Sequence, residues 1–165
     1  MATTCKLIAK VSLGSDTTTI TFSSIPGTGY TDLYLTLSGR TSRASVLGQV
    51  VVKFNSVSST VRNLIGDGSS ASSSTNVGDL YVSGNNATAS TFGSTEIYIP
   101  NYTGTTQKSW SGFGVGETNA SSSYISVTAG LVNHTSAITD IELSTTDGHS
   151  YKSGSTAYLY GITKA

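Results

Sequence analysis

Charged residues are scarce in this sequence. Only 11% of its 165 residues are Asp, Glu, Lys or Arg, against about 25% in an ordinary soluble domain. Nine basic residues balance nine acidic ones, so the formal net charge is zero. Because no basic patch is available for a phosphate backbone, we expect no direct binding of nucleic acid. A neutral surface also lacks the repulsion that keeps copies of a protein apart, which suits close packing in an assembly.

Cysteine is scarce as well, and long apolar runs are absent. Cys5 is the single cysteine, so an internal disulfide is impossible. No stretch approaches the roughly 18 apolar residues that span a bilayer, and Met1–Gly14 has no apolar run of the kind found in signal peptides. We therefore expect neither a membrane partner nor a secretion address. The length fits one domain, residues 1–165, which one hydrophobic core can stabilise without a disulfide or metal.

The sequence does contain a regular alternation of apolar and polar residues. A period of two places one face of a strand on a core and the other face in a polar environment. Turn-forming residues separate the alternating runs, and no helical spacing persists for three turns. These features predict an all-β fold, an antiparallel β-sandwich of the jelly-roll kind. The clearest alternating runs are Cys5–Val11, Leu33–Leu37, Val50–Phe54, Ile97–Ile99, Ile125–Val127, Ile141–Leu143 and Ala157–Leu159.

Two segments do not follow the simple pattern. Gly66–Asp79 consists almost entirely of residues that are common in turns and linkers, so we expect an exposed, mobile loop. In Ser109–Glu117 (SWSGFGVGE), the period of two puts Trp110, Gly112, Gly114 and Gly116 on one face, and we expect Phe113 and Val115 to face the core. Bare glycines in a strand indicate close approach of another group. That group is either another part of the same chain or a neighbouring subunit.

Catalytic and metal-binding patterns are not found. His134 and His149 lie near Asp140 and Asp147 in the sequence, but there is no nucleophile elbow of the G-x-S-x-G kind. Two histidines and one cysteine give no zinc spacing, and Asp67–Asp79 lacks the calcium-loop pattern. We therefore predict a protein that is not an enzyme, with no catalytic residue, no metal and no cofactor.

The tyrosines offer two alternative uses. Nine are present, and several alternate with core positions, so they point outward or into a second layer. Tyrosine supplies a large contact area at low entropic cost and is favoured at protein interfaces. It also forms platforms on which sugars stack, as in lectins. As possible subunit or partner contacts we single out Trp110, Gly112, Gly114, Tyr102, Tyr158 and Tyr160.

Five segments occur in an order that resembles a known group of proteins. They are Ser23–Arg40 (SSIPGTGYTDLYLTLSGR), Val50–Asn55 (VVVKFN), Glu96–Tyr102 (EIYIPNY), Ala137–Gly148 (AITDIELSTTDG) and Thr156–Ile162 (TAYLYGI). The series resembles small structural proteins of tailed phages, especially cyanophages, and it spans nearly the whole chain. The resemblance supplies no catalytic residues and does not locate a contact face.

The resemblance implies a capsid decoration or cement protein. Such a protein is made in the bacterial host cytoplasm and lies on the outer surface of the capsid. It is a jelly-roll domain, often a homotrimer, that stabilises the head by binding the major capsid protein. Many copies around symmetry axes turn modest contacts into large avidity. The alternative, suggested by the tyrosines, is a receptor-binding or carbohydrate-binding module of a phage tail or head fibre. A hydrolase ranks last, because no acid–base pair stands out.

Overall fold

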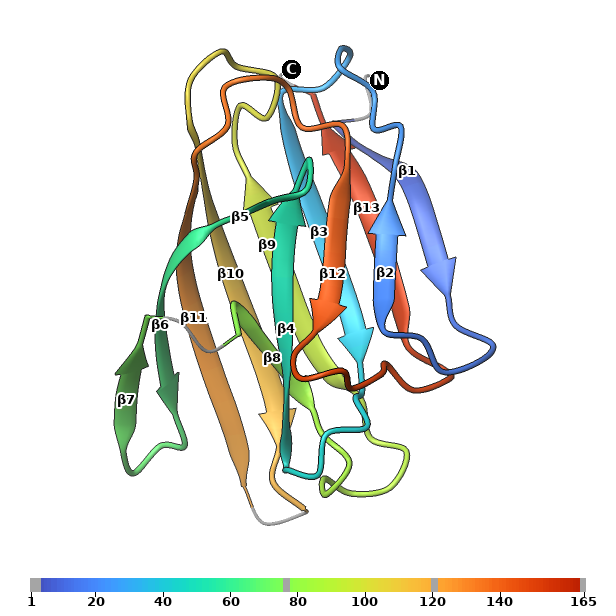
Figure 1. Cartoon of the computed structure of the whole chain (residues 1–165), viewed down its shortest axis with the longest axis vertical. Coiled ribbons are helices and arrows are strands. Elements are labelled where there is room, and N and C mark those ends of the chain that lie inside the picture. Colours follow the sequence, from blue (N-terminus) through green and yellow to red (C-terminus); the bar gives the residue numbers. More distant parts are fainter. Residues whose placement is uncertain (1–3, 76–77, 120–121, 164–165) are drawn as a thin grey trace.

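A computed structural model describes residues 4–75, 78–119 and 122–163. These residues form strands and loops without a helix, arranged as two antiparallel sheets (Figure 1). In spatial order, the larger sheet contains β1 (Cys5–Ser12), β13 (Thr156–Ile162), β3 (Asp32–Gly39), β9 (Gly93–Ile99), β10 (Lys108–Glu117), β11 (Ser123–Val132), β6 (Thr60–Gly66) and β7 (Ala71–Ser74). The smaller sheet contains β2 (Thr19–Phe22), β12 (Ile141–Thr145) and β4 (Leu47–Phe54), and β4 also pairs with β5 (Val57–Ser58) and β8 (Leu80–Ser83).

The two sheets pack face to face as a β-sandwich, which confirms the predicted fold class. The chain passes repeatedly from one sheet to the other, so that β1, β3, β9 and β13 share the larger sheet while β2, β4, β8 and β12 share the smaller one. The resulting orders, β1-β13-β3-β9 and β2-β12-β4-β8, are those of an eight-stranded jelly roll.

Two insertions widen one of these sheets. The segment β5–β7 lies between β4 and β8, and β10–β11 lies between β9 and β12. Together they add β10, β11, β6 and β7 to the edge at β9. In Figure 1 the larger sheet therefore extends past the smaller one on the side of β11, β6 and β7.

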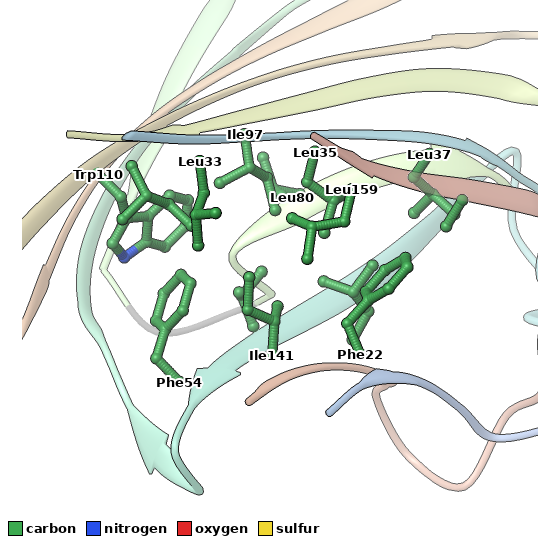
Figure 2. Close-up of a cluster of buried hydrophobic side chains, with 14 of the residues drawn as sticks. Phe22, Leu33, Leu35, Leu37, Phe54, Leu80, Ile97, Trp110, Ile141 and Leu159 are labelled. Atoms are coloured by element: carbon green, nitrogen blue, oxygen red, sulfur yellow. The ribbon is translucent and has the colours of Figure 1, made fainter. Parts of the chain in front are cut away.

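The core lies between the sheets and follows the predicted alternation. Leu33, Leu35 and Leu37 of β3 are buried on one side, and Val50, Val52 and Phe54 of β4 face them. Figure 2 shows side chains from both sheets interdigitating, with Trp110 and Phe54 at one end and Leu37 and Phe22 toward the other. β1 departs from strict alternation: a register shift between Leu7 and Ala9 leaves Leu7 exposed while Ala9 and Val11 pack on the core.

The glycine-rich strand β10 is oriented opposite to our expectation. Trp110, Gly112, Gly114 and Gly116 face the interior, whereas Phe113 is exposed and Val115 is half-buried on the outer face. The prediction that Phe113 and Val115 face the core was therefore wrong. A period of two fixes which residues share a face, but it does not say which face is inside when one face is mostly glycine.

The same chain fills the space above these glycines. A Cβ on Gly112 would lie 2.5 Å from Leu80 Cδ2, and one on Gly114 would lie 2.7 Å from the Tyr81 carbonyl oxygen. A Cβ on Gly116 would lie 2.8 Å from Leu47 Cδ2. Strand β8 and the start of β4 thus pack directly on the backbone of β10. Of the two alternatives for the glycine face, the structure shows the one in which the group that approaches belongs to the same chain.

Candidate functional site

The outer face of the larger sheet is the most unusual surface of the molecule. Every large hydrophobic side chain that the described residues expose lies on this face. These side chains are Leu7, Leu64, Tyr98, Phe113, Ile125, Val127 and Leu131. A concentration of exposed apolar groups on one face indicates an interaction surface, whereas single scattered ones do not.

Five of these side chains form what we call the apolar strip. It consists of Leu64 on β6, Phe113 on β10, and Ile125, Val127 and Leu131 on β11. Phe113 pairs with Val127, and Val127 pairs with Leu64, so these three form one row across three neighbouring strands. The strip lies entirely on the strands that the two insertions add to the jelly roll. The sheet thus gains width and an apolar surface from the same segments.

Two shallow depressions lie along this face, one toward each end of the strip's central row. One, of about 290 Å³, lies between β6, β7 and β11 and is bordered by Leu64, Ser73 and Val127. A second, of about 230 Å³, is bordered by Val127 and Phe113 on one side and by Tyr98 and Tyr34 on the other. Because Val127 borders both, the two depressions meet in the apolar strip. The two depressions can receive protruding side chains of a partner.

Four tyrosines on the jelly-roll half of the same face form what we call the tyrosine row: Tyr34 on β3, Tyr98 on β9, and Tyr158 and Tyr160 on β13. Tyr34 pairs with both Tyr98 and Tyr160 across the strands. The ring centroids of Tyr34 and Tyr160 are 6.5 Å apart, and those of Tyr158 and Tyr160 are 6.4 Å apart and stacked. Lys10 Nζ lies 5.4 Å from the centroid of Tyr158. Three of the rings therefore lie side by side across β9, β3 and β13, and Tyr158 extends the row along β13.

Carboxylates hold Tyr34 and Tyr98 of this row in place. The Tyr34 hydroxyl donates to Glu96 Oε2, which raises the pKa of Tyr34 to about 12. The Tyr98 hydroxyl donates to Asp32 Oδ2 at 2.8 Å, which raises its pKa as well. Asp32 Oδ1 also accepts the backbone N–H of Asn101 at 2.8 Å, so this carboxylate is itself held in place. The hydrogen bonds order both rings before any partner arrives.

The six residues predicted as partner contacts divide into two groups. Gly112 and Gly114 lie beneath β8, and Trp110 is buried in the core against Phe54. Tyr102 is fully buried, with its hydroxyl donating to the Pro26 carbonyl. None of these four is accessible to a partner while the domain is folded. Tyr158 and Tyr160 lie in the tyrosine row on the outer face, where their contact with a partner stays a prediction.

Sequence reasoning missed the apolar strip and did not single out Tyr34. A signal for Tyr34 is present, since it alternates with the buried Leu33 and Leu35. Leu64, Val127 and Leu131 have no comparable signal. Leu64 alternates outward with Thr60 and Arg62, so nothing in β6 marks it. In β11 the exposed face is the apolar one, whereas the buried face holds Ser126, Thr128 and Gly130. In an alternating strand, the apolar residues are normally taken as the buried ones.

Two buried cations have structural partners. The Arg40 guanidinium donates four hydrogen bonds of 2.6–3.0 Å, to the carbonyls of Asn85, Ala87, Thr88 and Thr91 in the loop before β9. The Lys108 ammonium donates to the carbonyls of Gly104 and Thr106, both at 2.6 Å, and its burial lowers its pKa. Both groups are satisfied by loop backbone, which holds the loops in position.

The histidines do not assemble with acids into a catalytic arrangement. His134 Nε2 lies 2.9 Å from Asn55 Nδ2, and the His149 backbone N–H donates to the Thr146 carbonyl. Across residues 4–75, 78–119 and 122–163 no three His, Cys, Asp or Glu side chains gather in a way that could hold a metal ion. In the same ranges no helix has the length and apolarity needed to cross a membrane.

No protein-family model, curated protein or solved structure matches the chain.

Proposed function

We propose that this chain is a virion structural protein, a cement protein that decorates a phage capsid by binding the major capsid protein. The observation that supports this proposal best is the apolar strip. Five large hydrophobic side chains are exposed on three neighbouring strands of a rigid sheet, in a chain with zero formal net charge. Such a surface gains free energy by leaving water and meets little electrostatic resistance from a partner.

The shape of the strip favours a broad protein surface as its occupant. Leu64, Phe113 and Val127 lie side by side across the strands, and the depressions on either side of Val127 are open and shallow. A small apolar molecule would bury most of its surface only in a deeper cavity. A capsid shell offers an extended surface with many copies, so a contact of modest free energy is multiplied by avidity.

We also propose that the protein assembles as a homotrimer on the shell. β7 (Ala71–Ser74) is the outermost strand of the larger sheet beside the apolar strip, and its side chains are small and mostly exposed. An open edge strand invites pairing with another chain, and contact between copies at this edge would cover it. Mass measurement by light scattering distinguishes a trimer from a monomer. A monomeric mass at all concentrations and on the particle contradicts the trimer.

Co-sedimentation with purified, tail-free phage heads tests the proposed function. The wild-type protein is expected to sediment with the heads in saturable amounts. Val127→Asp places a charge at the centre of the apolar strip and is expected to weaken this binding at least tenfold, because the carboxylate would lose its water on docking. Ser38→Asp is the matched control. Ser38 is exposed on the same face, on β3 of the jelly-roll half, and its substitution is expected to leave binding unchanged.

Two results would count against the proposal. One is failure of the folded wild-type protein to bind heads at all. The other is equal binding by wild-type protein and Val127→Asp, which would remove the apolar strip as the contact surface. Circular dichroism and a urea transition for each variant show whether a loss of binding comes from unfolding.

A further inference from the structure

We propose that the outer face also binds a neutral saccharide, in the depression between Tyr34, Tyr98 and Phe113. This activity goes beyond the proposed capsid contact. It depends on the tyrosines of the face, although the depression shares Phe113 and Val127 with the apolar strip. The depression measures about 230 Å³, and Glu96 and Ser111 also line it. Aromatic rings beside carboxylate and hydroxyl groups in an open site are the combination that sugars require. Their C–H faces stack on rings, and their hydroxyl groups need hydrogen-bond partners.

The aromatic part of the site is ordered in advance. Tyr34 and Tyr98 are direct cross-strand partners on β3 and β9 and project from the same face. Each hydroxyl donates to a carboxylate, Tyr34 to Glu96 and Tyr98 to Asp32, so neither ring needs to be immobilised when a ligand arrives. Binding to a rigid platform costs less conformational entropy than binding to mobile side chains.

The polar groups of the site can form further hydrogen bonds. Glu96 Oε2 accepts from Tyr34, but no described residue donates a hydrogen bond to Glu96 Oε1. A carboxylate oxygen accepts hydrogen bonds from sugar hydroxyls, and such charge-assisted bonds are the stronger kind. The Ser111 hydroxyl lies at the same depression and can donate or accept. Because Glu96 and Asp32 both bring negative charge, the site favours a neutral sugar over one with carboxylate or phosphate groups.

The tyrosine row extends this site into a track for a chain of several sugars. From Tyr98 and Tyr34 the aromatic rings continue to Tyr160 and Tyr158, at centroid separations of 6.5 and 6.4 Å for the last two steps. Tyr98, Tyr34 and Tyr160 lie side by side across three strands, and Tyr158 follows Tyr160 along β13. A site for a quaternary ammonium group instead needs rings on several sides of one point. We therefore assign a neutral oligosaccharide or polysaccharide, not an organic cation, as the ligand.

Affinity electrophoresis with neutral polysaccharides tests this assignment. Native gels at alkaline pH contain hydroxyethylcellulose, dextran or galactomannan, and migration is compared with that in a plain gel. Wild-type protein is expected to be retarded by at least one of the three. Tyr98→Ala and Tyr34→Ala are expected to abolish the retardation, because each removes a stacking surface. Tyr98→Phe keeps the ring and is expected to retain binding, and Glu96→Gln is expected to weaken it about tenfold, the loss of one strong hydrogen bond.

The control variant is Leu64→Ser, which alters the apolar strip outside this depression and is expected to leave the retardation unchanged. The proposal is overturned if none of the three polysaccharides retards the folded wild-type protein. It is equally overturned if Tyr98→Ala is retarded as strongly as wild type, or if only an anionic polysaccharide such as alginate binds. Tetramethylammonium is titrated in parallel by NMR. Shifts at Tyr34 and Tyr98 with this cation, and none with saccharide, also refute it.

Discussion

The indole ring of Trp110 lies directly over Gly130, its cross-strand partner on β11. A Cβ added to Gly130 would stand 2.0 Å from Trp110 Cε2, well inside contact distance. The indole Nε1 donates to Ser59 Oγ at 2.8 Å, and the ring meets Phe54 edge-on at a centroid distance of 5.8 Å. Gly130 thus provides the space that the largest core side chain needs, and Trp110 joins the inserted strands to the jelly-roll core.

Substitution of Gly130 by Ala is therefore expected to destabilise the protein. The new methyl group cannot coexist with the indole in its present position, and overpacking a well-filled core costs about 3 kcal/mol. Urea denaturation measures the free energy of unfolding. Gly14→Ala is the control, since nothing lies within 4 Å of a Cβ at that position. A similar small effect for both variants would show that Trp110 does not need the space above Gly130.

The glycine face of β10 gives a second prediction. In Gly114→Val, the Cβ alone would stand 2.7 Å from the Tyr81 carbonyl oxygen of β8, which is backbone and cannot rotate away. We expect a loss of about 3 kcal/mol in the isolated subunit, seen as a lower melting temperature. Ser111→Val, on the exposed face of the same strand, is the control. If Gly114→Val melted normally and failed only in assembly, a neighbouring subunit would occupy the glycine face instead.

The β10 segment also shows where sequence patterns fail. In β3, leucine marks the inner face and polar or tyrosine residues mark the outer face, so the period of two predicted the orientation of this strand. In β10 the inner face holds Trp110 and three glycines, while the outer face holds Phe113. For this strand, the hydrophobic pattern predicts the wrong face as the buried one. The deciding fact is that β8 packs against the bare backbone. The glycines indicate that some group approaches, but the local sequence does not say which distant segment it is or that this face is the inner one.

The Ser-rich segment Gly66–Asp79 illustrates the same limit. Its composition predicts a loop, yet it contains the edge strand β7 and ends at the buried Asp79. An edge strand of small polar residues has the composition of a linker, so only pairing with β6 distinguishes it. The outward position of Tyr158 and Tyr160 could be predicted because they alternate with the buried Leu159. The apolar strip could not be predicted, because the sequence does not show which face of β11 the smaller sheet covers.

Arg40 gives a prediction about loop stability. Its guanidinium is almost fully buried and donates only to backbone carbonyls of the loop before β9, with bonds to Thr88 and Asn85 among them. Arg40→Met retains the apolar stem and removes these bonds, so we expect a loss of about 3 kcal/mol in the free energy of unfolding. Arg62→Met, at an exposed position, should cost under about 0.5 kcal/mol. Equal small losses would mean that the loop does not depend on Arg40.

The hydrogen bond between Tyr34 and Glu96 predicts the titration of the tyrosine. The neighbouring carboxylate accepts a hydrogen bond from the phenol and opposes the phenolate charge, which raises the pKa of Tyr34 to about 12. In Glu96→Gln the negative charge is absent, so this pKa is expected to fall toward the ordinary value of about 10. NMR of protein labelled at the tyrosine ζ carbon follows the titration of this residue. An unchanged pKa in the variant would show that burial, not Glu96, controls Tyr34.

Asp79 places a titrating group inside the fold. Its Oδ2 accepts the Val52 backbone N–H at 2.6 Å, while the Asp79 carbonyl accepts from the Thr128 hydroxyl. Burial outweighs the Val52 hydrogen bond and raises the pKa of Asp79 from 3.8 to about 6. The folded protein therefore holds this proton more tightly than the unfolded chain does. The stability contributed by protonation is fully present below pH 3.8 and is lost as pH rises through about 6.

We therefore expect the free energy of unfolding to fall by about 2 kcal/mol between roughly pH 4.5 and 7 because of this residue. Asp79→Asn keeps an oxygen acceptor for Val52 and cannot ionise, so its pH dependence should be flatter by that amount. The slope is the relevant quantity, since the added amide hydrogens shift stability equally at every pH. Asp16 and Asp67 have lowered pKa values, so their effects fall at lower pH and are common to both proteins. The free energy of unfolding is measured by urea denaturation at each pH. If it changed with pH by the same amount in wild type and Asp79→Asn, Asp79 would already be charged in the folded protein at pH 4.5.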